Sequence, residues 1–303
     1  MRKSVAAVLA ALAVTGVVPA LAASASLPEK ITLKTAGFLP EGVEYDTKNK
    51  RFLVGSLAQG TVFVVGNDGT LTPFVSDPDI KGSVGIEVDE ERNRLLVAVG
   101  DRAPAGDAKL GVFDLSTGKR IAMVNLMAVG PPDAKAHFAN DLTVGPDGSV
   151  YVTDTRARVL YKVSPKYEPS LFLAMPSAER LNGIVAHPHG YLLVAESGAG
   201  DIYKVPLDKP ASFAKVKLSE QVQGDDGLLW HPDDCLIVVR NDPSLLVLAL
   251  KSTDDWVSAK VDSKATTTSQ QTTAALTDAG IYVVHPFFQD AKAMPYIERV
   301  TLK

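Results

Sequence analysis

The feature that most constrains the fold is a unit that recurs six times along the chain. Each unit begins with a short apolar strand, passes through a turn rich in Gly, Asp, Asn or Pro, and returns along an alternating strand. The clearest copy is DLTVGPDGSVYVTDTRARVLYKV at 141–163. Repeats of about 40–50 residues with four strands each are typical of β-propeller blades. The residues just before the first strands are 42 to 56 apart and are Glu41, Val84, Asn140, Asn182, Asp226 and Thr272.

Helical periodicity is nearly absent beyond the N-terminal segment, which favours an all-β fold. Six repeats predict a six-bladed β-propeller with four-stranded blades. The C-terminal strand IERVTL (297–302) is predicted to share a blade with the N-terminal strand ITLKTAG (31–37). This pairing would close the ring and remove the exposed sheet edges. No linker divides the repeats, so we expect one domain over residues 23–303.

Residues 1–22 have the pattern of a secretory signal peptide, with a basic start, an apolar run and a small-residue cleavage site. A membrane anchor is the alternative, but the apolar run at 4–19 is shorter than the roughly 20 residues that span a bilayer. We therefore expect an exported protein, periplasmic or secreted, that leaves the membrane after cleavage. Cys235 is the only cysteine, so no internal disulfide is expected.

Cleavage after residue 22 would change the formal charge from −4 to −6 by removing Arg2 and Lys3. A mildly acidic chain without basic tracts is not expected to bind nucleic acid. The sequence leaves the oligomeric state open.

Four of the six residues before the first strands carry carboxylate or amide oxygens, namely Glu41, Asn140, Asn182 and Asp226. First strands line the central channel of a propeller, so these side chains should converge at one end of it. Burying them without partners is costly, and a divalent cation would balance the two carboxylates. Oxygen donors favour Ca²⁺, with Zn²⁺, Mg²⁺ and Mn²⁺ as the alternatives. For one such residue a turn cap is the ordinary explanation; four at one repeat position favour a single metal site.

The second strand of each unit returns to the same end of the channel. Most residues at the ends of these strands are polar or charged, and we expect four of them to contact substrate: Asp154, Glu196, Arg240 and His285. Solvated loop positions are the alternative for each. His137 closely precedes Asn140 and is predicted to overhang the same opening, where Asn140 would also meet the substrate. The second unit contributes Val84 and Val99, which predict an apolar side for a carbon skeleton.

Four motifs resemble the SMP-30/gluconolactonase/regucalcin-like family of six-bladed propeller lactonases, over nearly the whole mature chain. They are PEGVEYD (40–46), FANDLTVGPDGSVYVTD (138–154), LNGIVAHP (181–188) and DDGLLWHPDD (225–234). The resemblance implies one divalent metal held by Glu41, Asn182 and Asp226, with Asn140 near metal and substrate. Members that hydrolyse sugar lactones often have an arginine where this chain has Phe138. That difference favours a more apolar lactone or another ester.

These features predict a metal-dependent hydrolase that opens a lactone or a related small ester. Asp226 is the candidate base for the attacking water, or else only a metal ligand. The Gly-x-Ser-x-Gly elbow of serine hydrolases is absent from the sequence. The alternatives are a paraoxonase-like arylesterase with a second, structural metal, and a non-catalytic metal-stabilised binding propeller. A condensing enzyme resembling strictosidine synthase is a more distant alternative.

Overall fold

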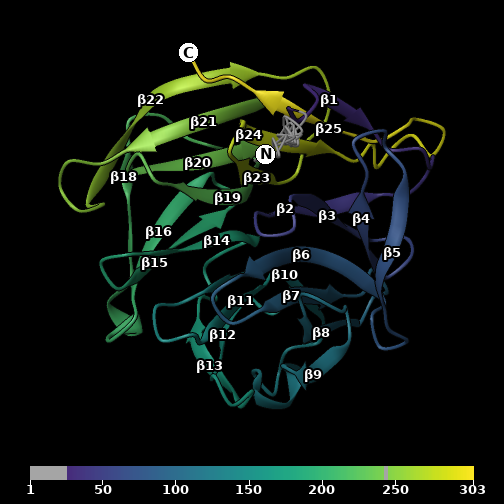
Figure 1. The fold of residues 1–303 in the computed structure, drawn as a ribbon. Coiled ribbons are helices and arrows are strands. Elements are labelled where there is room, and N and C mark those ends of the chain that lie inside the picture. The colour runs from purple at the N-terminus through teal and green to yellow at the C-terminus, as the bar shows by residue number, and fades with distance from the viewer. Residues whose placement is uncertain (1–25, 242–244) are drawn as a thin grey trace, which may run out of the picture.

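The computed structural model describes residues 26–241 and 245–303, and the predicted signal peptide lies outside them. The described chain is nearly all strand, arranged as sheets around a common centre in a propeller-like fold (Figure 1). Its helices are two short 3₁₀ turns, η1 (Met127–Val129) and η2 (Pro210–Ser212). Within the described ranges, no helical segment has the length and apolar character needed to cross a bilayer.

The strands of the described residues form five hydrogen-bonded sheets. The first is β2 (Pro40–Asp46), β3 (Arg51–Ser56), β4 (Thr61–Val65) and β5 (Leu71–Ser76). An eight-stranded sheet contains two antiparallel halves. One half is β6 (Gly82–Asp89), β7 (Arg94–Gly100), β8 (Gly106–Asp114) and β9 (Arg120–Asn125); the other is β10 (His137–Val144), β11 (Val150–Asp154), β12 (Val159–Val163) and β13 (Pro169–Ala174). Only a short parallel pairing between β8 and β10 joins the halves.

The next sheet is β14 (Leu181–His187), β15 (Tyr191–Glu196), β16 (Asp201–Pro206) and β17 (Ala214–Lys215). The five-stranded sheet is β19 (Asp225–His231), β20 (Cys235–Arg240), β21 (Leu246–Lys251), β22 (Ser258–Thr266) and the short parallel strand β18 (Lys217–Leu218). The last is β23 (Ala274–Thr277), β24 (Gly280–His285), β25 (Tyr296–Val300) and β1 (Lys30–Thr32). Strand β1 is shorter than predicted, but it pairs antiparallel with β25 as the sequence implied.

The first strands of the repeat units contact one another in a closed ring, in the order β2, β6, β10, β14, β19 and β23. Glycines near the start of four of these strands, Gly42, Gly85, Gly183 and Gly227, allow the close approach. A Cβ on Gly42 would lie 2.5 Å from the carbonyl oxygen of Val84, and one on Gly183 would lie 2.3 Å from that of Asp226. The repeated glycine therefore fixes the spacing between neighbouring inner strands and brings the residues before them together.

Apolar side chains fill the space between neighbouring sheets. One cluster joins the first and last sheets through Phe52, whose ring centroid lies 5.1 Å from that of Tyr282. Cys235 is buried in another such cluster. The sheets are therefore held to one another by core contacts between them.

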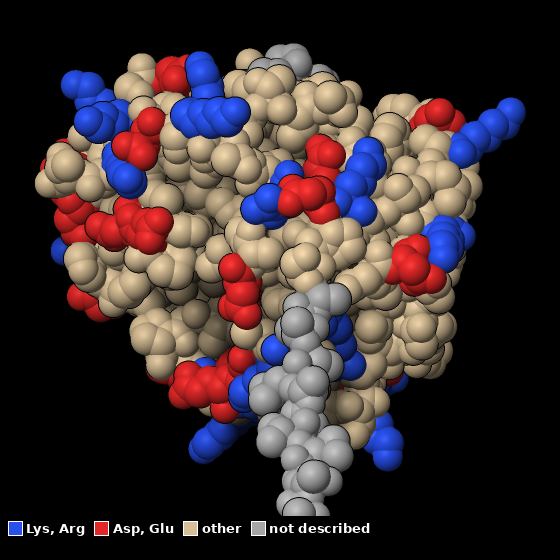
Figure 2. Space-filling view, turned by 45° about the horizontal axis from the view of Figure 1, so that its top comes forward, with Lys and Arg blue, Asp and Glu red and all other residues tan. Residues whose placement is uncertain are grey.

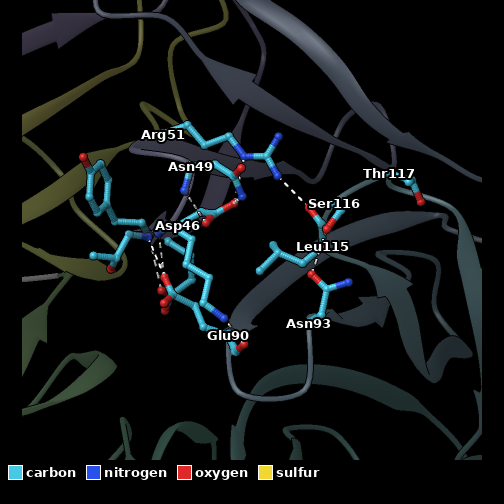
Figure 3. A network of polar contacts seen from close by, with 12 residues as sticks. Asp46, Asn49, Arg51, Glu90, Asn93, Leu115, Ser116 and Thr117 are labelled. Carbon is cyan, nitrogen blue, oxygen red and sulfur yellow. Dashed lines mark hydrogen bonds and ion pairs between the residues drawn. The ribbon is translucent and has the colours of Figure 1, made fainter.

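Hairpin turns at the far end of the channel connect neighbouring units through arginine. Asp46 accepts a hydrogen bond from Arg51 at 2.9 Å, and Arg51 donates to the carbonyl of Leu115 in the next unit (Figure 3). The next hairpin repeats the arrangement: Arg94 donates to Asp89 at 2.6 Å and to the carbonyl of Gly148. Both pairs are five residues apart in the sequence, so the repeat also encodes these connections.

On the face drawn in Figure 2, basic and acidic side chains lie interspersed. Exposed ion pairs of the chain include Lys34 with Asp68 and Arg120 with Asp79. Exposed pairs contribute little stability each, because water and salt screen them.

Candidate functional site

A cavity of about 380 Å³ opens where the repeat units begin. Three of the four predicted metal ligands line it, which are Asn140, Asn182 and Asp226. The remaining lining residues are also polar or glycine: Thr155, Arg180, Ser197, Gly224, Asp225, Asn241 and Gln270. Residues from three consecutive repeat units therefore meet at one cavity, as the repeat register implied for these three.

Each of the three oxygen-bearing residues is held by a side chain that lies 15 positions later in the same unit. Asn140 Nδ2 donates to Thr155 Oγ1 at 2.9 Å, and Asn182 Nδ2 donates to Ser197 Oγ at 3.2 Å. Both hydroxyls in turn donate to backbone carbonyls of the following unit, those of Leu181 and Asp225. Because each amide nitrogen is engaged by a hydroxyl, the amide oxygen is the end left for a ligand.

The third pair has the same spacing and a different chemistry. Asn241 Nδ2 donates to Asp226 Oδ2 at 2.6 Å, and Gln270 Nε2 donates to Asn241 Oδ1 at 2.7 Å. Burial raises the pKa of Asp226 to about 6, while hydrogen bonds from Asn241 and Asn182 and the charge of Arg180 oppose the rise. Asp226 is therefore oriented through one oxygen and is largely ionised at neutral pH.

Glu41, the fourth predicted ligand, is 6% exposed and is not among the residues that line the cavity. Its Oε2 has no hydrogen-bond partner in the described part of the chain. Burial raises the pKa of Glu41 well above its ordinary value, and the charges of Asp226 and Asp141 add to the rise. A buried carboxylate oxygen without a donor, close to other carboxylates, is the environment that a cation would stabilise.

Further along the channel, three more carboxyl groups line a constriction of about 20 Å³: Glu44, Glu87 and Asp141. Burial raises the pKa of Asp141 to about 7 and, together with the charges of Asp141 and Asp89, that of Glu87 to about 8. The channel is therefore strongly acidic. Even so, within the described ranges no three His, Cys, Asp or Glu side chains are arranged to hold a metal ion. The candidate set of two carboxylates and two amides is of a different kind.

The predicted substrate contacts at the ends of the second strands do not line the cavity. Buried Asp154 accepts hydrogen bonds from the backbone of Phe138 and Ala157 and contacts His137 Nδ1 at 2.8 Å. Buried Glu196 accepts four backbone hydrogen bonds, from the N–H groups of Glu179, Arg180, Gly198 and Ala199. Both carboxylates brace the loops beside the cavity, and the structure places His137 against Asp154.

Arg240 and His285 have similar positions. Arg240 Nε donates to the carbonyl of Gln223 at 2.9 Å. His285 is fully buried, with Nδ1 3.0 Å from the carbonyl oxygen of Gln270 and Nε2 3.2 Å from Glu298 Oε1, outside hydrogen-bond geometry. Burial lowers the pKa of His285 to about 4, so it is neutral at physiological pH. These side chains support segments that reach the cavity.

Strand pairing explains why the residues at the ends of the second strands do not line the cavity. Asp154 pairs with Ala139 and Glu196 pairs with Leu181, so each shares a face with the residue before the predicted ligand. Successive side chains in a strand point to opposite faces. The residues one step later, Thr155, Ser197 and Asn241, therefore point toward the cavity. The prediction was one residue too early at these strands.

Sequence reasoning considered the position two residues before the predicted ligands only at Phe138. In the next three units Arg180, Gly224 and Gln270 occupy the equivalent position, two residues before Asn182, Asp226 and Thr272, and they line the cavity. The signal was present in the repeat, because the same register that selects Asn182 and Asp226 selects these residues.

The expectation that Val84 and Val99 form an apolar side of the opening is wrong. Val84 and Val99 are buried in the hydrophobic core, and neither lines the cavity. Phe138 also packs against a core cluster, with the Arg156 guanidinium 5.5 Å from its ring centroid. The apolar side chains at these positions pack in the hydrophobic core, so the residues that line the cavity are polar or glycine.

The sequence matches no family model and no curated protein. The fold is similar to that of the allergen Mala s 1 from Malassezia sympodialis, with a TM-score of 0.75 and 18% identity over 92% of this chain and 97% of that one. It is similar to a putative gluconolactonase (TM-score 0.64, 15% identity, 91% and 93% covered). It is also similar to a calcium-binding regucalcin from Agrobacterium tumefaciens (TM-score 0.65, 14% identity, 91% and 95% covered). At these identities the likeness establishes a shared propeller-like fold.

Proposed function

We propose that this chain is an exported, divalent-metal-dependent hydrolase that opens a lactone or related small ester. In this proposal residues 23–303 form one six-bladed propeller, with the two antiparallel halves of the eight-stranded sheet counted as separate blades. The closed ring of six first strands supports that count. The similarity in fold to a putative gluconolactonase and to a calcium-binding regucalcin supports the activity and the metal.

One observation carries the proposal. Thr155, Ser197 and Asn241 hold three oxygen-bearing side chains at one cavity with a common spacing. Supports of this kind orient ligands in metal sites and tune their affinity. Together with the unpartnered Glu41 Oε2, they present two carboxylates and two amide oxygens. This donor set fits Ca²⁺ first, with Mg²⁺, Mn²⁺ and Zn²⁺ as alternatives.

In the proposed reaction, Glu41, Asn140, Asn182 and Asp226 would hold the cation, which when bound polarises the carbonyl and acidifies water. Asp226, ionised at neutral pH, accepts a proton from the attacking water, or acts only as a ligand. A bond forms between the water oxygen and the carbonyl carbon, and the ring C–O bond breaks. The departing oxygen takes a proton, and the product is a hydroxy acid that ionises to its carboxylate. Asn241 keeps Asp226 oriented through these changes.

The test combines metal removal with a substrate panel. Purified protein is treated with a chelator, assayed on a set of lactones and aryl esters, and assayed again after addition of Ca²⁺, Mg²⁺, Mn²⁺ or Zn²⁺. We expect activity to be lost and then restored by one cation, and Asp226→Ala to abolish it. Full activity after complete metal removal would exclude this mechanism. A panel without activity, combined with tight metal binding, would favour the non-catalytic binding propeller.

The number of metal ions per chain distinguishes the proposed hydrolase from the paraoxonase-like arylesterase. One cation per chain is expected for the proposed site, whereas about two would favour the arylesterase. The periplasmic or secreted location is tested by fractionating the producing cells and sequencing the mature N-terminus.

A further inference from the structure

Arg180 extends a charged side chain along the wall of the cavity. Its side chain is exposed and lines the cavity two residues before Asn182. No hydrogen bond or ion pair engages its guanidinium within residues 26–241 and 245–303, although its backbone is bonded on both sides. Arg180 therefore brings a positive charge to the cavity wall, close enough to act on Asp226.

Backbone hydrogen bonds fix the position of Arg180 beside the cavity. Arg180 N–H donates to Glu196 Oε1 at 2.8 Å, and the Arg180 carbonyl accepts from the N–H of Ser197 at 3.0 Å. Ser197 is also the residue that holds Asn182. The base of the arginine side chain and the Asn182 amide are therefore tied to the same short segment, so their separation is set by the fold.

The character of the cavity limits what could fill it. Every lining side chain is polar, and a volume of about 380 Å³ is near the lower end of small-molecule sites. A guanidinium pairs with a carboxylate through two parallel hydrogen bonds, a geometry that a neutral hydroxyl cannot match. Since Asp226 and Glu41 would be balanced by the cation, Arg180 remains available for an anionic group on the substrate.

We propose that Arg180 is a specificity-determining residue that selects small, hydroxylated lactones carrying a free carboxylate. This inference takes the reaction, lactone hydrolysis, from the proposed function. The ring carbonyl lies toward Asn140, Asn182 and Asp226, and the free carboxylate lies toward Arg180. The polar wall provides hydrogen bonds for the hydroxyl groups between these two ends.

Binding measurements test the charge preference without requiring turnover. Calorimetry with glucarate, gluconate and glucitol compares a dianion, a monoanion and a neutral molecule on one six-carbon skeleton, in the presence of the identified cation. We expect wild type to bind glucarate more tightly than gluconate. Arg180→Gln should weaken glucarate binding about 10-fold or more and gluconate binding about two-fold at most, as expected for loss of one charge-assisted pair.

Two further variants make the result specific. Arg180→Lys keeps the charge without the two-pronged geometry and should recover only part of the loss. Lys166→Gln removes a positive charge from an exposed turn at the opposite end of the blade and should change neither affinity. The inference is overturned if wild type does not prefer glucarate, or if Arg180→Gln weakens all ligands equally or none.

Kinetics separate this inference from the proposed function. Because the Arg180 charge also lowers the pKa of Asp226, the comparison is made at a pH well above 6. There, Arg180→Gln should raise KM more for a carboxylate-bearing lactone than for a neutral lactone of equal ring size. If wild type hydrolyses no lactone but still prefers the dianion through Arg180, the lactonase proposal fails and the binding assignment stands. If lactones are hydrolysed and Arg180→Gln has no selective effect, the lactonase proposal stands and the binding assignment of Arg180 fails.

Discussion

Asn241 donates a hydrogen bond of 2.6 Å to Asp226; Asp226 lies in β19, and Asn241 directly follows the paired strand β20. The Asn241 side chain is itself fixed by Gln270, from the following unit. Asp226 is thus presented to the cavity through a chain of amides. Its position depends on residues that would not touch the metal or the substrate.

The first prediction concerns this support. Asn241→Ala should lower metal affinity or kcat/KM about 10- to 100-fold, the range observed when the hydrogen-bond partners of metal ligands are removed. Metal titration and steady-state kinetics measure the two quantities. Asn67→Ala, in an exposed turn at the far end of the first sheet, serves as the control and should have wild-type values. An unchanged Asn241→Ala would show that the amide chain is dispensable.

The second prediction concerns the hydroxyl supports. Thr155→Val removes the acceptor for Asn140, and Ser197→Ala removes the acceptor for Asn182. Each amide can then rotate and present nitrogen in place of oxygen, so we expect each variant to bind the cation about 10-fold more weakly. Calorimetric titration of Ca²⁺ measures the effect. If both variants bind as wild type does, the amide oxygens are not ligands.

The third prediction follows from the acidic constriction. The folded-state pKa values of Asp141, about 7, and Glu87, about 8, are raised above those of the unfolded chain. Carboxyl groups of this kind contribute stability while protonated, and that contribution is lost as pH rises through the folded values. In chelator, the free energy of unfolding should therefore decline between about pH 5 and pH 9.

Denaturant unfolding at several pH values measures that decline. Glu87→Gln removes one ionisation and should reduce the decline by on the order of 4 kcal/mol over this range. Asp68→Asn, at an exposed carboxyl, is the control. A metal-free protein whose stability is flat over this range would contradict the prediction.

The fourth prediction uses the far end of the channel. Arg94 and Asp89 form a buried pair, whereas Arg51 in the equivalent pair is partly exposed. Breaking a buried pair leaves an uncompensated charge, so Arg94→Met should lower the free energy of unfolding by about 3–5 kcal/mol. Arg51→Met should have a smaller effect, and neither should alter metal affinity. Equal losses in the two variants would show that burial does not set the cost.

Much of this arrangement could be predicted from the sequence because the repeat register is regular. The register by itself selects Asn140, Asn182 and Asp226, which line the cavity, and it pairs the N-terminal strand with the C-terminal one, as β1 and β25 are paired. Side-chain direction at the strand ends was harder. The first strands shift register between Ala139 and Leu142 and between Leu181 and Ile184. Such bulges break the simple alternation, so counting along the strand does not show which face a residue joins.

Side-chain exposure at unit boundaries was equally hard to predict. Phe138 and Val84 occupy repeat positions that face the channel in other units, yet both are taken into core clusters. Arg180 at the same register as Phe138 is left in the cavity. Contacts with loops decide which of two equivalent positions lines the cavity and which packs in the core. The composition of these loops does not specify their conformations.

The common 15-residue spacing places each oxygen donor and its support on one hairpin. A substitution in one hairpin can thus remove or replace a single donor while its neighbours stay anchored by their own contacts. A scaffold organised in this way can exchange ligands one at a time and still fold at every step. Drift toward a different cation or a different substrate would need only local changes, each confined to a single turn and its two strands.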